Sequence, residues 1–343
     1  MKAKIKTKII IALCAGIAVL LLGVAIGSVN IPPADVLRIV GHNMFGLALP
    51  EHITPGQNAI VWSIRFPRAL VAFCAGAALS VSGAVMQSLL RNPLASSYTL
   101  GVSSGASLGA SLVILVGISL PFLSVLTLPV LGFVFGLGTV LLVISITKKL
   151  DPSLESHTII LTGIVLALFI NAVSTLLFVF YQENMQRMVF WQMGSFSMLG
   201  WQAVYILAPV TIIGVFFITR FKWELDVMTF GEEQSQAIGV DTRRVKLILL
   251  ITASALTGST IAFAGVIGFV DLVSPHIVRK LFGASHRHVI PMSALVGGTF
   301  MVLADLAART VTSPVELPVG AVTAIIGAPF FAYVYFSKRK EQA

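Results

Sequence analysis

Charged residues that border long apolar segments are the first candidates for chemistry in this chain. Arg65 and Arg68 stand just before an apolar run of membrane length, and Arg309 closes another such run near the C-terminus. A charge beside a lipid bilayer is costly and is usually kept for a function. These three residues therefore predict either anchors for lipid phosphates or an exposed cationic patch that receives an acidic partner.

Residues that could catalyse a reaction or bind a metal are scarce. The sequence has no G-x-x-x-x-G-K-[ST] stretch, which excludes ATP hydrolysis by a P-loop. It has no H-E-x-x-H motif and no Cys–His or Ser–His–Asp set in a plausible site. Two of the three histidines in 275–288 lie in a basic turn without carboxylates or thiols, and Cys14 and Cys74 lie inside apolar runs. We therefore expect no enzyme, no metal site, no cofactor and no disulfide.

The composition is that of a polytopic membrane protein. Of the 343 residues, 57% are hydrophobic and 11% are charged, and the mean hydropathy is +0.95. Soluble domains carry about 25% charged residues. The net charge of +9 is spread between apolar runs, so a nucleic-acid partner is not expected. The apolar stretch after four N-terminal lysines is longer than the core of a secretory signal, which predicts a retained first transmembrane helix.

We predict an all-α protein with one transmembrane domain over 1–343. A bilayer core needs about 20 apolar residues in a helix. Ten segments qualify, and the eighth is short. They are 9–29, 69–90, 98–120, 122–146, 158–180, 203–219, 247–266, 268–283, 290–309 and 319–336.

The distribution of basic residues predicts the orientation of these spans. An even number of spans puts both termini on one side of the membrane. That side then holds all but five of the 23 Lys and Arg residues, which indicates the cytoplasm. The five on the other side are Arg38, Arg65, Arg68, Arg187 and Arg309.

Two segments on the predicted cytoplasmic side differ from simple connections. The stretch 231–246, GEEQSQAIGVDTRRVK, suits short amphipathic helices split by Gly239 at the membrane surface, or else a solvated loop. Its apolar centre favours a docking surface. In the turn 91–97, Pro93 prevents a helix from continuing and biases Asn92 toward an extended conformation.

Several long motifs resemble one family, the FecCD-type permeases. The first is RFPRALVAFCAGAALSVSGAVMQSLLRNPLASSYTLGVSSGASLG; later come WQMGSF, GVIGFVDLVSPHIVRKLFGASHRHVIPMSALVGG and ADLAARTVTSPVELPVGAVTAIIGAPFF. The resemblance runs from about 60 to 336. One departure is Asp271, where the family usually has glycine. Members are the membrane subunits of ABC importers for ferric siderophores, haem or cobalamin.

The resemblance implies a cobalamin-importer-like fold of ten helices and a set of partners. The subunit would pair with a second permease as a homodimer or heterodimer, with the substrate path along their interface. A substrate-binding protein, periplasmic or lipid-anchored, would dock outside. A dimer of a separate ATPase, which binds ATP and magnesium, would dock inside.

The resemblance also implies roles for individual residues. Three arginines would pair with glutamates of the binding protein, four residues would form cytoplasmic constrictions, and six would belong to helices that couple to the ATPase. In that order they are Arg65, Arg68 and Arg309; Asn92, Leu94, Ser156 and His157; and Gln236, Ala237, Gly239, Val240, Arg243 and Arg244.

Other functions have weaker support from the sequence. A secondary carrier driven by an ion gradient usually needs polar or ionisable groups near the bilayer midplane. Asn171 is a candidate of that kind, but it stands alone. A membrane-embedded enzyme lacks a catalytic set. We therefore expect an importer permease in the cell membrane with a ferric siderophore as its first candidate cargo, and haem or cobalamin as alternatives.

Overall fold

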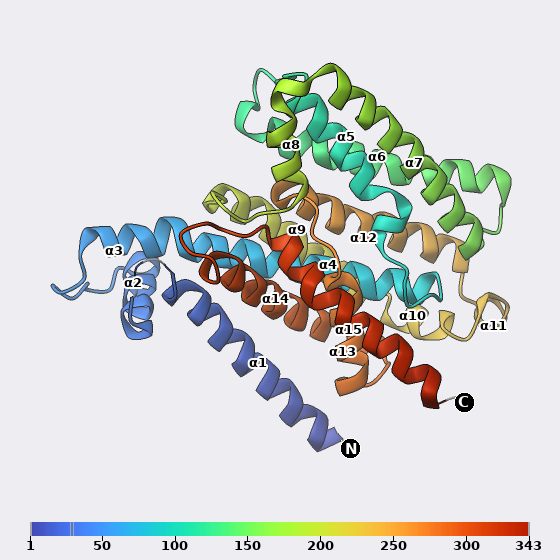
Figure 1. The fold of residues 1–343 in the computed structure, drawn as a ribbon. Coiled ribbons are helices and arrows are strands. Elements are labelled where there is room, and N and C mark those ends of the chain that lie inside the picture. Colours follow the sequence, from blue (N-terminus) through green and yellow to red (C-terminus); the bar gives the residue numbers. More distant parts are fainter. Residues whose placement is uncertain (1, 28, 30, 342–343) are drawn as a thin grey trace.

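The ten segments predicted to span the membrane all correspond to helices. The structure is a computed structural model that describes residues 2–27, 29 and 31–341, and within these residues it contains helices and no strand. The ten helices lie side by side in one bundle (Figure 1). They are α1 (Lys2–Ala25), α4 (Phe66–Leu89), α5 (Val102–Ile114), α6 (Thr127–Leu150), α7 (Ser156–Phe180), α9 (Trp201–Thr219), α12 (Thr242–Ala264), α13 (Val270–Phe282), α14 (His286–Thr310) and α15 (Val319–Glu341).

The lengths of these helices refine the predicted spans. Among the described residues, seven helices are long and apolar enough to cross a membrane, and α5 and the described part of α15 are shorter apolar helices. The predicted span 98–120 was therefore too long. With 13 residues, α13 measures about 20 Å, less than a bilayer core of about 30 Å. The predicted span 9–29 includes position 28, which lies outside the described residues.

The second predicted span begins too late, because a longer helix contains it. Short helix α3 (Pro55–Ala59), a π-helical turn over Ile60–Arg65 and α4 form one continuous helix, Pro55–Leu89. Pro67 lies inside this continuous helix, at the second position of α4. Proline lacks an N–H and its ring crowds the preceding turn. The wider π-turn just before it accommodates this, and the Phe66 N–H bonds to Val61 O, five residues back.

Helix α4 forms the centre of the bundle, where it contacts α9, α12, α13 and α14. In the most apolar stretch of the helix Pro55–Leu89, 83% of the residues are buried, against 17% in the corresponding stretch of α7 on the periphery. Glycines permit this close packing: a Cβ on Gly76 would lie 2.2 Å from Gly297 O, and one on Gly83 would lie 1.9 Å from Asp271 O. The small-residue stripes in the sequence thus bring helices into backbone contact.

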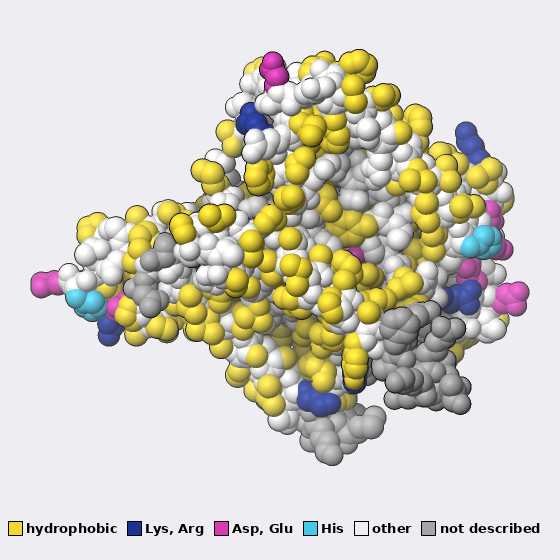
Figure 2. Space-filling view, in the orientation of Figure 1, with side chains coloured by type: hydrophobic (Ala, Val, Ile, Leu, Met, Phe, Trp, Pro, Cys, Tyr) yellow, Lys and Arg dark blue, Asp and Glu magenta, His cyan; other side chains and the backbone are white. Residues whose placement is uncertain are grey.

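Five further short helices lie between or beside the spans, and two of them bear on function. Figure 2 shows a largely hydrophobic surface with most of its charged side chains near the left and right ends of the molecule. At the right-hand end lie α10 and α11 (Figure 1). The helices are α2 (Pro33–Phe45), α3, α8 (Met185–Gln192), α10 (Lys222–Met228) and α11 (Glu232–Ala237).

Candidate functional site

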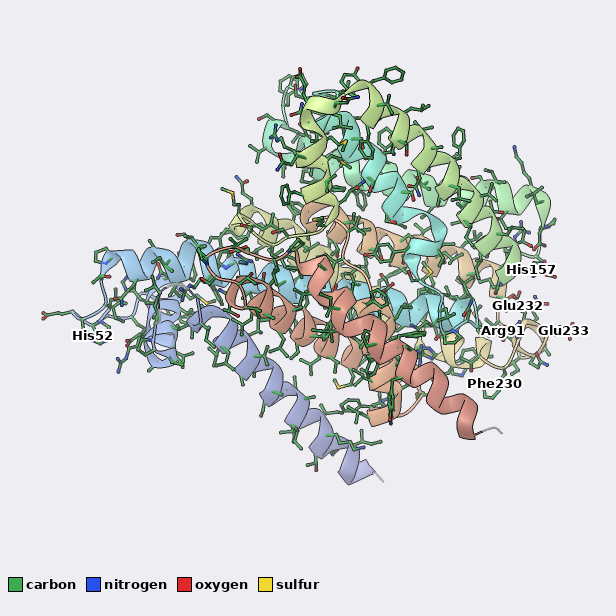
Figure 3. All side chains as sticks on the ribbon, in the orientation of Figure 1. His52, Arg91, His157, Phe230, Glu232 and Glu233 are labelled. Atoms are coloured by element: carbon green, nitrogen blue, oxygen red, sulfur yellow. The ribbon has the colours of Figure 1, made fainter. Side chains whose placement is uncertain are left out.

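A polar cavity of about 820 Å³ brings together residues from two of the predicted sites. Its lining comes from the end of α4 and the turn that follows, from the beginning of α7, and from α11 with its flanks. Asn92, Ser156 and His157 of the predicted constrictions line it, and so does Gln236 of the predicted coupling segment. Figure 3 shows part of this lining on the right, where Arg91, His157, Phe230, Glu232 and Glu233 are labelled.

The turn after α4 holds Asn92 and Leu94 in a fixed local geometry. The Asn92 Oδ1 accepts a hydrogen bond from the Leu94 N–H at 2.9 Å. Arg91 adopts a left-handed conformation with φ +47°, which ends the helix before Pro93. Leu94 is 46% exposed and is not part of the cavity lining. The structure therefore places Asn92 at the cavity and Leu94 on the outer side of the same turn.

The beginning of α7 forms the opposite wall of the cavity. Ser156 is the first residue of α7 and His157 the second. The His157 Nδ1 lies 3.3 Å from Glu155 Oε2, but both side chains are more than half exposed, so this pair contributes little stability. The imidazole is therefore free to change its orientation at the edge of the cavity.

The predicted coupling segment is helical, but its helices are arranged differently from the prediction. Gly239, at φ +92°, separates α11 from the long helix α12 and not two short surface helices from each other. The Asp241 side chain caps α12 by accepting a hydrogen bond from the Arg244 N–H at 3.0 Å, and the helix then continues to Ala264. The pair of short helices is α10 and α11, and Gly231, at φ +125°, lies between them.

The six predicted coupling residues lie together around this bend. Gln236 and Ala237 end α11, and the Gln236 Nε2 donates to Thr242 Oγ1 at 3.0 Å. Val240 is buried, whereas Arg243 and Arg244 at the beginning of α12 are exposed. This region thus presents a surface of polar and basic side chains that rests on a buried apolar residue.

A second connection to this surface is absent from the sequence prediction. The Asp226 carboxylate, on α10, accepts a hydrogen bond from the backbone N–H of His286 at 2.8 Å, and the same oxygen lies 2.6 Å from the ring Nδ1. The other ring nitrogen, Nε2, lies 2.7 Å from Ser88 Oγ on α4. Helix α10 is therefore joined through His286 to the end of α4, four residues before Asn92.

These three residues have the connectivity of a Ser–His–Asp triad, although the sequence analysis found no such set. Ser88 is 6% exposed and His286 is 2% exposed, so a substrate cannot reach the hydroxyl. Arg279 also contacts the Ser88 hydroxyl, with its Nη2 at 3.3 Å. The arrangement is therefore a buried structural network, and the sequence signal for it was the polar residue at the end of α4.

The three arginines predicted to form an exposed patch have largely buried side chains, so this part of the prediction is wrong. Arg65 and Arg68 are 5% and 8% exposed, and the side chain of Arg309 is 8% exposed. Arg65 donates to the backbone oxygens of Ala25 at 2.9 Å and Val29 at 2.6 Å, beside the end of α1. Carbonyl groups at a helix end lack partners within the helix, which makes them acceptors for a cation.

Arg68 is the centre of an ion cluster with two acids far away in the sequence. Its Nη2 lies 2.8 Å from Asp305 Oδ1, and its Nη1 lies 2.9 Å from Glu316 Oε1. Arg309 lies 3.6 Å from Asp305 and donates to the backbone oxygen of Gly23. Glu316, in the loop after α14, is partly exposed, and the hydrogen bond from Arg68 holds the pKa of its carboxyl below the usual range. Docking by these arginines stays a prediction, and within this chain they connect helices.

Other residues of note have simpler surroundings. Asp271 is 3% exposed at the first turn of α13, and its backbone oxygen accepts a hydrogen bond from Gln87 Nε2 at 3.2 Å. Within the described residues, no group of three or more His, Cys, Asp or Glu could hold a metal ion.

Comparisons with known proteins give this geometry a context. A family model, the FecCD transport family, matches residues 13–337. The Fe(3+)-citrate import system permease protein YfmE of Bacillus subtilis (strain 168) is 34% identical, with 93% of this chain and 92% of that protein covered. The cobalamin import system permease protein BtuC of Halobacterium salinarum is 38% identical, with 81% and 73% covered.

A solved structure is similar over almost the whole chain. It is described as an inward-facing conformation of a metal-chelate type ABC transporter, and its sequence is 29% identical. The TM-score is 0.84, with 97% of this chain and 99% of that chain covered.

Proposed function

The chain belongs to the FecCD transport family as the permease subunit of an ABC importer, and we propose that it carries a ferric siderophore across the cell membrane. An importer of this kind works with a separate ATPase and a substrate-binding protein, so ATP is hydrolysed outside this chain. Support for a ferric cargo comes from the ferric-citrate relative, which matches 93% of this chain, against 81% for the cobalamin relative.

The cavity between the end of α4 and the beginning of α7 is the proposed gate of the transport path. The observation that carries this proposal is that Asn92, Ser156 and His157 meet Gln236 in one lining. A gate must lie where the force that opens it is applied, and here the predicted constriction and the predicted coupling segment share a wall. The cavity is polar, which suits the passage of a hydrophilic chelate.

The surface around α10 and α11 is the proposed docking site of the ATPase. Three large apolar side chains are exposed there, although this surface lies outside the apolar spans: Trp223 at 53%, Phe230 at 76% and Ile238 at 59%. Exposed apolar groups among polar residues are typical of a protein interface. Arg243 and Arg244 add positive charge for acidic groups on the partner.

The same end of the bundle is the proposed cytoplasmic end, with both termini on that side. In Figure 1 the N-terminal end of α1 lies at the bottom, a little right of the centre, and the C-terminal end of α15 lies at the lower right, below α10 and α11. Near the N-terminus, the Lys8 Nζ donates to Leu281 O at 2.8 Å, at the end of α13. The peripheral helix α7 leaves large apolar side chains exposed, among them Leu168 at 64% and Phe169 at 65%. We infer from this that α7 faces lipid or a second permease subunit, in a homodimer or heterodimer.

Reconstitution tests the proposed function. The chain, its ATPase and its binding protein are placed in vesicles, and uptake of a labelled ferric siderophore, haem or cobalamin is measured with and without ATP. We expect ATP-dependent uptake of the ferric siderophore, and only with both partners present. Faster uptake of haem or cobalamin would show that the cargo is not a ferric siderophore, and it would leave the proposed ATP-driven import unchanged. Uptake by the chain alone under an ion gradient would indicate a secondary carrier.

A further inference from the structure

One lysine connects the proposed ATPase-docking surface with the proposed gate. Lys246 lies near the beginning of α12, and its side chain is 1% exposed. Its Nζ donates to the Glu232 carboxylate at 2.5 Å and to the backbone oxygen of Leu154 at 2.8 Å. A buried ammonium group is stable only where such partners replace water. Three segments therefore meet at one charge: α12, α11 and the loop that leads into α7.

The loop on the α7 side is held in a conformation that requires support. Leu154 has φ +58°, a left-handed conformation that is unfavourable for a residue with a Cβ, and its side chain is fully buried. The Asp151 carboxylate closes the turn before it and accepts hydrogen bonds from the N–H groups of Ser153 at 2.9 Å and Glu155 at 2.7 Å. Because Ser156 begins α7 two residues after Leu154, the bond from Lys246 fixes where α7 begins.

The partner on the α11 side is Glu232, and a movement of α11 would change its ion pair with Lys246. Glu232 lies in the first turn of α11, its side chain is 22% exposed, and it lines the same cavity as Ser156 and His157. A displacement of α11 therefore either carries the ammonium group with it or breaks the ion pair. Breaking the pair would leave Lys246 buried without its counter-charge, which is strongly unfavourable.

We propose that Lys246 is a positioning residue that transmits movement of α11 to the beginning of α7, so that docking and closure of the ATPase change the width of the cavity. This inference rests on the proposed function, because it takes α11 as part of the docking surface. It assigns a role to the last residue of the predicted coupling segment 231–246, a residue that is not among the six predicted coupling residues. No sequence pattern predicts this role, because a lysine in the first turns of an apolar helix is typical of a cytoplasmic flank.

The test uses the full complex and two spin labels. Glu233→Cys on α11 and Leu161→Cys on α7, both exposed, carry the labels in a background with Cys14→Ser and Cys74→Ala. The distance between the labels is measured before and after ATP is added, together with uptake and ATP hydrolysis. With Lys246 present, ATP should change the distance. In Lys246→Met, hydrolysis should continue, the ATP-dependent change should disappear, and uptake should fall about tenfold, the size of a typical coupling between two sites.

Two further variants separate transmission from simple stability. Lys149→Met removes an exposed lysine at the end of α6 and should leave uptake and distances unchanged. Glu232→Gln keeps a hydrogen-bond acceptor for the ammonium group but removes its counter-charge, so it should reduce both uptake and the distance change. Lys246→Met leaves unpaired only a carboxylate that is 22% exposed, so it should fold. Normal uptake in Glu232→Gln and in a folded Lys246→Met, or a distance change as large as in the wild type, would overturn the proposal. Failure of the ATPase to bind the wild-type chain would overturn the proposed function as well.

Discussion

The two ends of the bundle use buried ionisable side chains in different ways. At one end, Arg68 lies between Asp305 and Glu316, and Arg65 and Arg309 bond to the end of α1. At the other end, Lys246 and His286 bond to acids on the short helices α11 and α10. Twenty residues of α4 separate Arg68 from Ser88, or about 30 Å along the helix axis.

The difference lies in the elements that the charges join. In the arginine cluster the partners are long helices and the loops that leave them, so the ion pairs hold spans against each other. At the opposite end each base is buried in a span, and each acid is partly exposed on a surface helix: Glu232 is 22% exposed and Asp226 is 37% exposed. Such a link can pass a displacement from the surface into the bundle. The element that carries the partner, and not burial alone, therefore indicates what a buried ionisable side chain does.

The largest effect should come from removing the acid at the centre of the arginine cluster. Asp305→Ala leaves Arg68 without its most buried partner and Arg309 without its nearest carboxylate. Breaking a buried ion pair from one side costs about 3–5 kcal/mol. The free energy of unfolding in detergent should fall by about this much, as measured by denaturant titration. Glu51→Ala, which removes an exposed acid, is the control. A loss no larger than in the control would show that the cluster does not hold the spans together.

A smaller effect is expected from a backbone change at the opposite end. Gly239 has φ +92°, and a Cβ there would meet open space, so Gly239→Val introduces backbone strain of about 1–3 kcal/mol without a clash. Because the strain lies between α11 and α12, uptake should fall although the protein folds and binds the ATPase. Vesicle uptake and ATP hydrolysis are measured together.

Gly117 provides the matched control for this change. It has φ +83° and open space around its Cβ position, and it follows α5 at the end remote from the turn 91–97. Gly117→Val should therefore destabilise the protein by a similar amount and leave uptake per folded molecule unchanged. Equal losses of uptake in both variants would mean that the bend at Gly239 has no special part in coupling.

The stability that Glu316 contributes at the exposed edge of the arginine cluster should depend only weakly on pH. Because Arg68 lowers the pKa of Glu316, the charged carboxyl stabilises the folded state above its unfolded pKa of about 4.3. That contribution is lost as the pH falls through the lower folded value. Since Glu316 is 39% exposed, the pair should contribute at most about 1 kcal/mol. Unfolding of the wild type and of Glu316→Gln at pH 7 and pH 3 gives the difference. If the free energy of unfolding depends on pH equally in the two proteins, the Glu316 carboxylate does not stabilise the folded state through Arg68.

The sequence predicted the positions of the helices well, because a bilayer sets the length of an apolar segment. It also predicted the turn at Pro93, where proline ends a helix by its own chemistry. It failed for the arginines, because motif position and charge balance place a residue along the membrane normal but not around its helix. Asp305 and Glu316 lie 237 and 248 positions from Arg68, so no local pattern could reveal the pairing.

The same limitation explains the residues missed at the gate. Lys246 and Leu154 are 92 positions apart, and His286 and Asp226 are 60 positions apart. Each looks like an ordinary flanking or loop residue until the helices are packed together. The predicted gate residues came from the family resemblance, and only Asn92 and Leu94 lie in a long motif. Three of the four line one cavity, and their role as a gate stays a proposal.

The smallest effect on stability is expected at the turn that carries Asn92 and Leu94. Asn92→Ala removes one partly exposed hydrogen bond, and Leu94→Ala shortens a side chain that is 46% exposed, so each change should stay within about 0.5 kcal/mol. Their functional effect should differ, because only Asn92 lines the cavity. Asn92→Ala should let preloaded chelate leak from vesicles that contain the complex without ATP, whereas Leu94→Ala should leak less. A leak from Leu94→Ala as large as that from Asn92→Ala would place the constriction outside the cavity. No leak from either variant would leave the cavity as a contact surface for the ATPase, and the charge links at this end would then move a docking face and not a gate.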